Sequence, residues 1–267
     1  MTNRRELLRL LAGSAPAAAG IGLWPSTLLA QARQAGLIAA NVCRLAPETT
    51  EGPFYLDPHL MRSDIREDRG GVPMTMRIQI VTADCRAIKR ARVDLWHCDA
   101  QGNYSGFANQ GSDARLGTRG QTFLRGTQIS GDDGQVAFRT IFPGWYRGRT
   151  THMHLKVILG RDEVLTGQIF FPDSLSQYVF ENAAAYDRSA VQDTTNADDW
   201  IAVEAGEGAY AGVTERSDGY DAALVVAVDH GGLRGATAPS RRGTVHSGAA
   251  SALAASPEPR ELAALRA

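Results

Sequence analysis

The chain has 267 residues, and its 28 Lys and Arg residues nearly balance its 29 Asp and Glu residues, which leaves a formal net charge of −1. This balance gives no general attraction to nucleic acid or to an anionic membrane surface, so we expect no nucleic-acid partner. A hydrophobic fraction of 43% with 21% charged residues is ordinary for a folded domain and excludes disorder along the whole chain. Plentiful glycine and proline and short β-branched runs favour a mainly β protein.

The first 32 residues have the pattern of an export signal. Arg4 and Arg5 precede a weakly apolar stretch at 10–23, and Ala30-Gln31-Ala32 follows as an A-x-A cleavage site. Paired arginines with modest hydrophobicity resemble a twin-arginine signal, whose pathway exports folded proteins. A membrane anchor or an ordinary N-terminal helix is the alternative, but glycine and proline interrupt a stretch that would need about 20 apolar residues to span a bilayer. We therefore expect cleavage after residue 32, no stable membrane anchor, and a periplasmic or extracellular protein.

The rest of the chain divides into one domain and a tail. We expect a folded domain over residues 33–232 and a disordered tail over 233–267, which mixes Ala, Ser, Pro, Gly and Arg without a strand or helix pattern.

Cys43, Cys85 and Cys98 lie in the mature chain. An oxidising compartment would allow one disulfide and leave one thiol, but buried unbridged cysteines fit equally well, and their spacing matches no zinc template.

The domain alternates apolar and polar residues with the period of a strand. Within residues 75–82, for example, Met76, Ile78 and Ile80 fall on one face and Arg77 and Gln79 on the other. Many short strands separated by turns predict a two-sheet β-sandwich with long loops and little helix. The predicted strands cover residues 75–82, 91–98, 123–130, 135–141, 151–159, 165–171 and 223–228.

Two other local signals concern a turn and a helix. Asp132-Asp133-Gly134 separates two predicted strands and predicts a hairpin between them. Helix is predicted only over residues 174–186, where Asp173 or Ser174 would cap the N-terminus.

The sharpest chemical feature is His152-Met153-His154. On a strand, residues i and i+2 point to the same side, so the two imidazoles converge while Met153, Leu155 and Val157 fill the opposite face. Histidine also occurs as a surface residue or a satisfied core residue, so the pair alone is a weak signal for a metal site.

Neighbouring residues strengthen this signal. Arg149 lies three residues before His152, and Tyr146 ends a segment in which Pro143 and Gly144 force an irregular loop. An aromatic hydroxyl placed on such a loop can reach inward. A second polar and aromatic segment, residues 94–106, leads from a strand into a loop that carries Tyr104.

Taken together and in this order, these segments resemble the intradiol ring-cleavage dioxygenases, the non-haem ferric enzymes that include protocatechuate and catechol dioxygenases. The chain looks like an exported type, and the resemblance covers nearly all of residues 43–228. It is carried by Thr50-Glu51-Gly52-Pro53-Phe54-Tyr55, Asp94-Leu95-Trp96-His97 with Tyr104, Pro143-Gly144-Trp145-Tyr146, Arg149 with His152-x-His154, and Gln168.

The resemblance implies a cofactor, one Fe(III) per chain, and four ligands. The positions that match the family's two tyrosinates and two histidines are Tyr104, Tyr146, His152 and His154. Ferric iron is a hard Lewis acid that favours anionic oxygen, and it lowers the effective pKa of a phenol from about 10, so that tyrosine binds as phenolate. The competing interpretation is two structural tyrosines with satisfied hydroxyls.

The resemblance also implies a reaction, in which O2 cleaves a catechol-type diol between its hydroxylated carbons to a cis,cis-muconate-type diacid that contains both oxygen atoms. Tyr146 would leave the metal when the diol binds and act as a base. Arg149 would stabilise negative charge on the substrate, and Gln168 would line the pocket. Tyr55 fits a wall of the substrate cavity and core packing equally well. His97 shares a strand face with apolar residues, so we predict a buried, hydrogen-bonded histidine.

Several questions stay open. The short distance from the predicted cleavage site to residue 51 leaves no room for the helical segment through which catechol dioxygenases dimerise, so the sequence does not predict the oligomeric state. A secreted β-sandwich that binds phenolics or carbohydrate without catalysis is the alternative function. A zinc hydrolase is disfavoured because no Asp, Glu or Cys stands near the histidines at ligand spacing. Which catechol is the substrate cannot be read from the sequence.

Overall fold

The structure, a computed structural model, describes residues 45–57, 59–110 and 116–229. The predicted export signal and tail and Cys43 lie outside these residues. Of the other two cysteines, Cys85 is disulfide-bonded and Cys98 is a buried free thiol. In the described part of the chain, no helix is long and apolar enough to span a bilayer.

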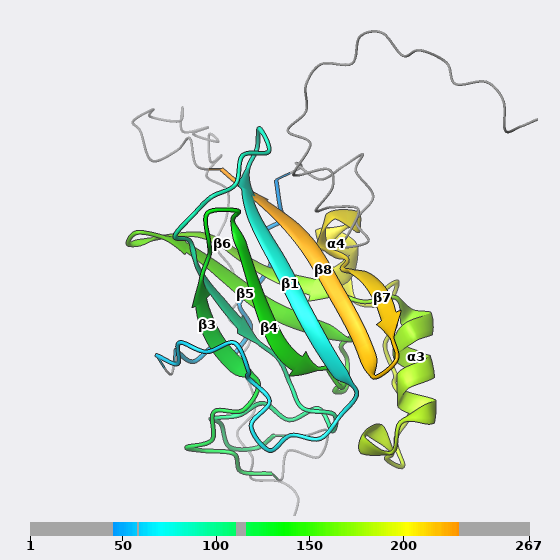
Figure 1. Cartoon of the computed structure of the whole chain (residues 1–267). Helices are drawn as coiled ribbons and strands as arrows, with labels where there is room; N and C mark the ends of the chain where they lie inside the picture. The colour runs from blue at the N-terminus through cyan, green and yellow to red at the C-terminus, as the bar shows by residue number, and fades with distance from the viewer. Residues whose placement is uncertain (1–44, 58, 111–115, 230–267) are drawn as a thin grey trace, which may run out of the picture. The chain divides into compact units, whose positions relative to one another are not determined.

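The strands form two four-stranded sheets, here named sheet A and sheet B (Figure 1). Neighbouring strands are antiparallel except for β1 and β8, which run parallel. Sheet A has the order β4-β1-β8-β7, with β4 Gln135–Ile141, β1 Pro73–Thr82, β8 Gly219–Val228 and β7 Gly212–Arg216. Sheet B has the order β3-β2-β5-β6, with β3 Arg125–Ile129, β2 Arg92–Trp96, β5 His152–Leu159 and β6 Asp162–Phe170.

The hydrophobic core lies between the sheets and follows from the strand period. From β1, Met76 and Ile78 are fully buried, and from β5, Met153, Leu155 and Val157 join the same cluster. Removal of these apolar side chains from water is the main favourable term that holds the two layers together. The predicted β-sandwich is confirmed, and so is the inward direction of the odd-numbered residues of β5.

The opposite face of sheet B carries a second, aromatic layer. Strand alternation turns His152, His154 and Lys156 away from the core. Trp96 and Gln168 stand beside His154 in the register of the neighbouring strands. Loops cover this face with a cluster of ring side chains around Trp96, Cys98 and Tyr104, against which pack Phe54, Tyr55, Phe107 and Tyr146.

The predicted hairpin at residues 132–134 is wrong. Its flanking strands β3 and β4 belong to different sheets, so the turn crosses from one layer to the other. The residues do make a tight turn, closed by a 3.0 Å hydrogen bond from Gly134 N to Gly131 O. Gly134 has a φ of +75°, and a Cβ there would lie 2.4 Å from the Ile80 carbonyl oxygen. The sequence therefore predicted the turn correctly, but a turn motif does not determine which strands pair.

The helical prediction is partly wrong. The predicted helix splits into α3, Asp173–Asn182, and a 3₁₀ turn, η2, Ala184–Tyr186, because Ala183 between them is extended. The helix begins after Pro172 with no side-chain cap, and the Asp173 carboxylate instead accepts from Asn196 N at 3.0 Å. A second short helix, α4, and strand β7 were not predicted. The helical bounds are α3 Asp173–Asn182, η2 Ala184–Tyr186, α4 Trp200–Ala205 and η3 Glu207–Ala209.

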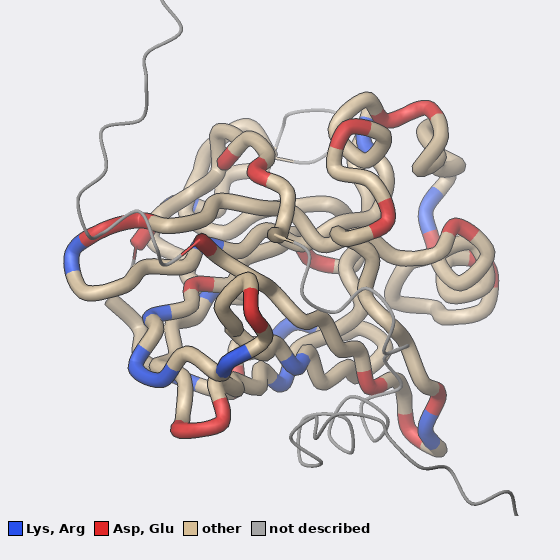
Figure 2. Tube along the Cα trace, turned by 90° about the horizontal axis from the view of Figure 1, so that it is seen from above, with Lys and Arg blue, Asp and Glu red and all other residues tan. Residues whose placement is uncertain are grey.

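Charged residues of both signs are interspersed along the described chain (Figure 2). Many are paired with a neighbour, as Arg66 with Asp64 at 2.8 Å and Arg92 with Asp94 at 2.9 Å. This pairing agrees with the near-zero formal charge of the sequence.

Candidate metal centre

Four side-chain donor atoms meet at one point on the outer face of sheet B. The Nε2 atoms of His152 and His154, both on β5, lie 3.2 Å apart. The Tyr104 hydroxyl oxygen lies 3.1 Å from Nε2 of His154 and 3.4 Å from Nε2 of His152. The Tyr146 hydroxyl oxygen lies 3.1 Å from Nε2 of His152. The structure thus brings the four predicted ligands together from one strand and two loops.

The two loops are tied to each other at Asp99. Its carboxylate accepts hydrogen bonds from Gln101 N at 3.0 Å and Asn103 N at 2.9 Å, which shapes the loop that carries Tyr104. Its carbonyl accepts from Gly144 N, two residues before Tyr146, at 3.2 Å. Asp99 therefore joins the two loops that bring in the phenols.

Ring stacking holds His154 from the side. The Trp96 ring lies parallel to the His154 ring, with centroids 5.0 Å apart. Tyr55 packs its edge against Trp96 at 4.9 Å, donates its hydroxyl hydrogen to Asp94 at 2.9 Å, and lies under the Lys156 ammonium. Tyr55 thus contacts the ring that stacks on His154, and its place in a wall of the substrate cavity stays a prediction.

His97 lies outside the cluster. It is fully buried, and its ring nitrogens bond the Cys98 carbonyl at 2.8 Å and the Thr140 hydroxyl at 2.6 Å. This is the buried, hydrogen-bonded histidine that the sequence predicted. Among the residues that the structure describes, no group of three or more His, Cys, Asp and Glu side chains gathers in a way that could hold a metal.

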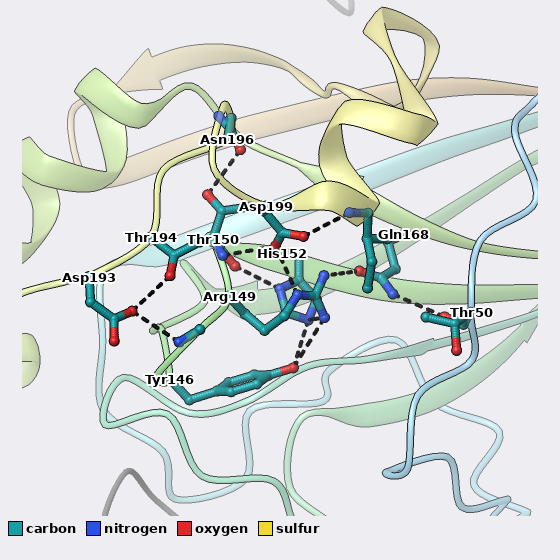
Figure 3. Close-up of polar contacts among 12 residues, drawn as sticks. Thr50, Tyr146, Arg149, Thr150, His152, Gln168, Asp193, Thr194, Asn196 and Asp199 are labelled. Atoms are coloured by element: carbon teal, nitrogen blue, oxygen red, sulfur yellow. Dashed lines mark hydrogen bonds and ion pairs between the residues drawn. The ribbon is translucent and has the colours of Figure 1, made fainter. Parts of the chain in front are cut away.

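Arg149 and Gln168 adjoin the donors (Figure 3). The Arg149 Nη1 atom lies 3.4 Å from Nε2 of His152 and 3.5 Å from the Tyr146 hydroxyl. Its Nη2 donates to Gln168 Oε1 at 2.6 Å, and Gln168 Nε2 donates to the Thr50 carbonyl at 2.9 Å. The amide of Gln168 is therefore fixed in orientation, with its oxygen toward the guanidinium.

The residues of the site differ in exposure. Tyr104 is 0% exposed, whereas Tyr146 and Arg149 are half-buried. Burial raises the pKa of Tyr146 to about 12 and the pKa of Tyr104 well above its usual value. Burial, with Arg149 nearby, lowers the pKa of His152 to about 3. With nothing bound, the phenols therefore keep their protons and the imidazoles are neutral.

The donor set fits a hard cation. The Thr150 carbonyl lies 2.7 Å from His152 Nδ1, and because a carbonyl only accepts, that nitrogen carries the hydrogen. The lone pair of Nε2 then points at the phenol oxygens. Separations of 3.1–3.4 Å between donor atoms suit a metal ion with bonds of about 2.0–2.2 Å. A trivalent ion would also supply the charge that two phenolates, one fully and one partly buried, need.

The fold matches solved dioxygenases. An intradiol ring-cleavage dioxygenase from Tetranychus urticae is similar with a TM-score of 0.64 and 32% identity, over 70% of this chain and 95% of that one. The dioxygenase domain of a carbohydrate-binding fusion protein from Streptomyces sp. SirexAA-E has a TM-score of 0.53 at 24% identity, covering 70% and 99%. The second likeness concerns the fold alone.

Residues 50–199, which include all four donors, match the model of the Dioxygenase family. The chain belongs to the intradiol dioxygenase family. Catechol 1,2-dioxygenase 1 from Acinetobacter lwoffii is 30% identical over 105 residues, 38% of this chain and 32% of that protein. Chlorocatechol 1,2-dioxygenase from Cupriavidus pinatubonensis is 26% identical over 161 residues, 50% and 59% of the two chains. The matches thus span a third to three-fifths of these curated relatives.

Two residues that adjoin the donors, Asp199 and Thr150, were not predicted from the sequence. The Asp199 carboxylate accepts from Arg149 Nε at 2.8 Å and from Thr150 N at 3.0 Å, although it lies about fifty positions further along the chain. An aspartate before a short helix is a capping signal, and α4 does begin there, with Ile201 N donating to Asp199 at 3.0 Å. That signal could have predicted the start of the helix, but not the contact between Asp199 and Arg149.

Close approach of the two tyrosine loops gives a testable stability effect. Gly102 has a φ of +86°, and a Cβ there would lie 2.2 Å from the Trp145 carbonyl oxygen. Gly102→Ala should therefore force the loops of Tyr104 and Tyr146 apart. Gly120 has a similar φ of +79° with nothing within 4 Å of its Cβ position, so Gly120→Ala measures the conformational cost alone.

We expect Gly102→Ala to lose about 1–3 kcal/mol more free energy of unfolding than Gly120→Ala, the usual cost of overpacking. It should also bind less metal than the control. Urea unfolding of both variants, with metal analysis, measures these quantities. Equal losses of unfolding free energy in the two variants would show that the two loops can separate at no energetic cost.

Proposed function

We propose that this chain is an Fe(III)-dependent dioxygenase that uses O2 to cleave a catechol-type diol between its two hydroxylated carbons, giving a cis,cis-muconate-type diacid. The convergence of two phenols and two imidazoles beside a half-buried arginine supports the proposal. Tyr104, Tyr146, His152 and His154 would hold one iron per chain. When bound, the iron supplies a Lewis acid that draws electron density from the diol and so prepares it for O2.

The difference in burial assigns the two tyrosines different roles. Tyr146 is the more exposed of the two, so an arriving diol would replace it as a ligand, and the phenolate set free would accept one phenolic proton from the diol and become a neutral tyrosine. Tyr104 is fully buried beneath Phe54, whose ring stacks on it at 4.6 Å. It has no path to solvent and stays in place throughout the reaction.

Arg149 and Gln168 act on the substrate side. The Nη1 group of Arg149 points to where the diol would replace Tyr146, so it stabilises negative charge on the ring. Gln168 holds the guanidinium through its amide oxygen and borders the same space.

The iron content and colour of the purified protein test this proposal. Phenolate bound to Fe(III) absorbs visible light, so the protein should be coloured and contain about one iron per chain. Oxygen uptake with a panel of catechol, protocatechuate, hydroxyquinol and substituted catechols, with product identification, should show turnover and name the preferred ring. A colourless protein that takes up zinc and turns over no diol would contradict the proposal, and a non-catalytic binding protein would then be favoured.

We also propose export through the twin-arginine-type signal at residues 1–32, which would carry the enzyme to the periplasm or beyond with its small-molecule substrates as partners. The paired arginines and the A-x-A site support it. Mass analysis of the protein from a periplasmic fraction tests it, because cleavage predicts a chain that begins after Ala32.

A further inference from the structure

We propose that Asp199 is the positioning residue of Arg149, which it fixes so that the Nη1 group faces the reacting diol. This inference rests on the proposed function. The Arg149 guanidinium has three nitrogen atoms, and each has a different neighbour (Figure 3). Nε donates to Asp199 at 2.8 Å, Nη2 donates to Gln168 at 2.6 Å, and Nη1 is directed at the Tyr146 hydroxyl and His152. Two edges of the planar group are thus held, and the third points into the site.

The burial of Asp199 suits it to hold the Nε edge of the Arg149 guanidinium. Its side chain is 0% exposed and that of Arg149 is 15% exposed. A buried carboxylate is stable only when it is paired and hydrogen-bonded, and here one oxygen receives both Arg149 Nε and Thr150 N. The same oxygen therefore joins the arginine side chain to the backbone that leads into His152. Without it, Gln168 alone would hold the guanidinium, which could turn toward solvent.

Asp199 also caps helix α4, and this second role has to be separated from the first. The cap uses the other carboxylate oxygen, Oδ1, which accepts from Ile201 N at 3.0 Å, whereas Oδ2 serves Arg149. Serine caps helices about as well as aspartate, but its side chain is too short to reach the guanidinium. Asparagine has one acceptor oxygen and can serve only one of the two partners. Asp199→Ser thus preserves the cap while removing the hold on Arg149, whereas the asparagine oxygen can keep the contact with Arg149 and give up the cap instead.

The test compares Asp199→Ser with the wild type as iron-loaded enzymes, with the best catechol of the panel as substrate. We expect the variant to keep its iron and colour and to lose on the order of 10- to 100-fold in kcat, because small misplacements of a reacting group have effects of that size. The KM should change little. In an Arg149→Leu background, Asp199→Ser should cause no further loss, since the residue acts through Arg149.

Asp193→Asn is the matched control. Asp193 lies in the same segment and accepts from Gly148 N at 3.0 Å, an acceptor role that asparagine retains, and it contacts neither Arg149 nor the donors. This variant should turn over as the wild type does. Wild-type kcat in Asp199→Ser, or losses that multiply in the double variant, would overturn the proposal.

A second measurement needs no iron. In the metal-free protein, the Arg149 Nε hydrogen should give a slowly exchanging nuclear magnetic resonance signal, identified by its absence in Arg149→Leu. Asp199→Ser should abolish that protection, and Asp193→Asn should not. Retained protection in Asp199→Ser overturns the positioning role. A wild-type protein without iron or turnover overturns the proposed function instead, and with it the catalytic consequence of the pair.

Discussion

Replacement of His152 or His154 with alanine is expected to leave the protein without iron. Each variant removes one of the two neutral nitrogen donors, whose Nε2 atoms lie 3.2 Å apart at the centre of the cluster. Both phenols already belong to the donor set, so neither can replace the lost nitrogen. Iron analysis and the visible spectrum measure the effect, and we expect loss of both the metal and the colour, with turnover falling to background.

His59→Ala is the control for these variants. The His59 side chain is 85% exposed and contacts Asp57 at the surface, so its loss should change neither iron content nor rate. Circular dichroism and thermal melting of the metal-free proteins show whether the histidine variants still fold. Folded variants that keep stoichiometric iron and near-normal turnover would refute the ligand set.

Arg149→Leu should have the opposite signature, with iron and colour retained and turnover lost. A guanidinium has no free lone pair for a metal and stays protonated at working pH, so it contributes charge and hydrogen bonds. A donor aimed at developing charge typically contributes about 10²–10³ in rate. We expect a loss of that size in oxygen uptake at saturating catechol. Arg149→Lys should recover only part of it, because a point charge cannot reproduce the planar fork.

Arg147→Leu is the matched control, since this arginine of the same loop is exposed and lies 3.9 Å from Asp193. It should leave the rate unchanged. An Arg149→Leu enzyme with the wild-type rate would make Arg149 a structural residue of the loop and would leave the four donors unaffected.

The sequence predicted the sandwich well because strand alternation is a local signal. Strand β4 has the predicted bounds, and the alternation in β5 correctly separated Met153 from the histidines. Strand β7 was missed because its residues are half-buried or exposed at the edge of sheet A and show no contrast between faces. Helix α4, with six residues, is too short for a helical period to be visible.

The residues of the candidate site could be predicted only in part from the sequence. The strand period placed His152 and His154 on one side, but nothing local brings Tyr104 and Tyr146 to them, and the family resemblance supplied those positions. The contact of Asp199 with Arg149 depends on how the segment after α3 folds back, so it is invisible in the sequence. Strand pairing is likewise a tertiary property, which explains why a correct turn signal at Gly134 gave a wrong hairpin.

The parallel pairing of β1 with β8 sets the order in which this molecule can be completed during synthesis. Sheet B and all four donors have emerged from the ribosome once β6 has been made, but sheet A lacks a central strand until β8 follows. Contacts so distant in sequence are slow to form, because a long loop must close before they stabilise anything. A nascent chain that stops between these strands leaves the apolar edge of β1 uncovered, which is a template for aggregation. Chaperone demand should therefore be highest late in translation, after the four donor side chains are already present.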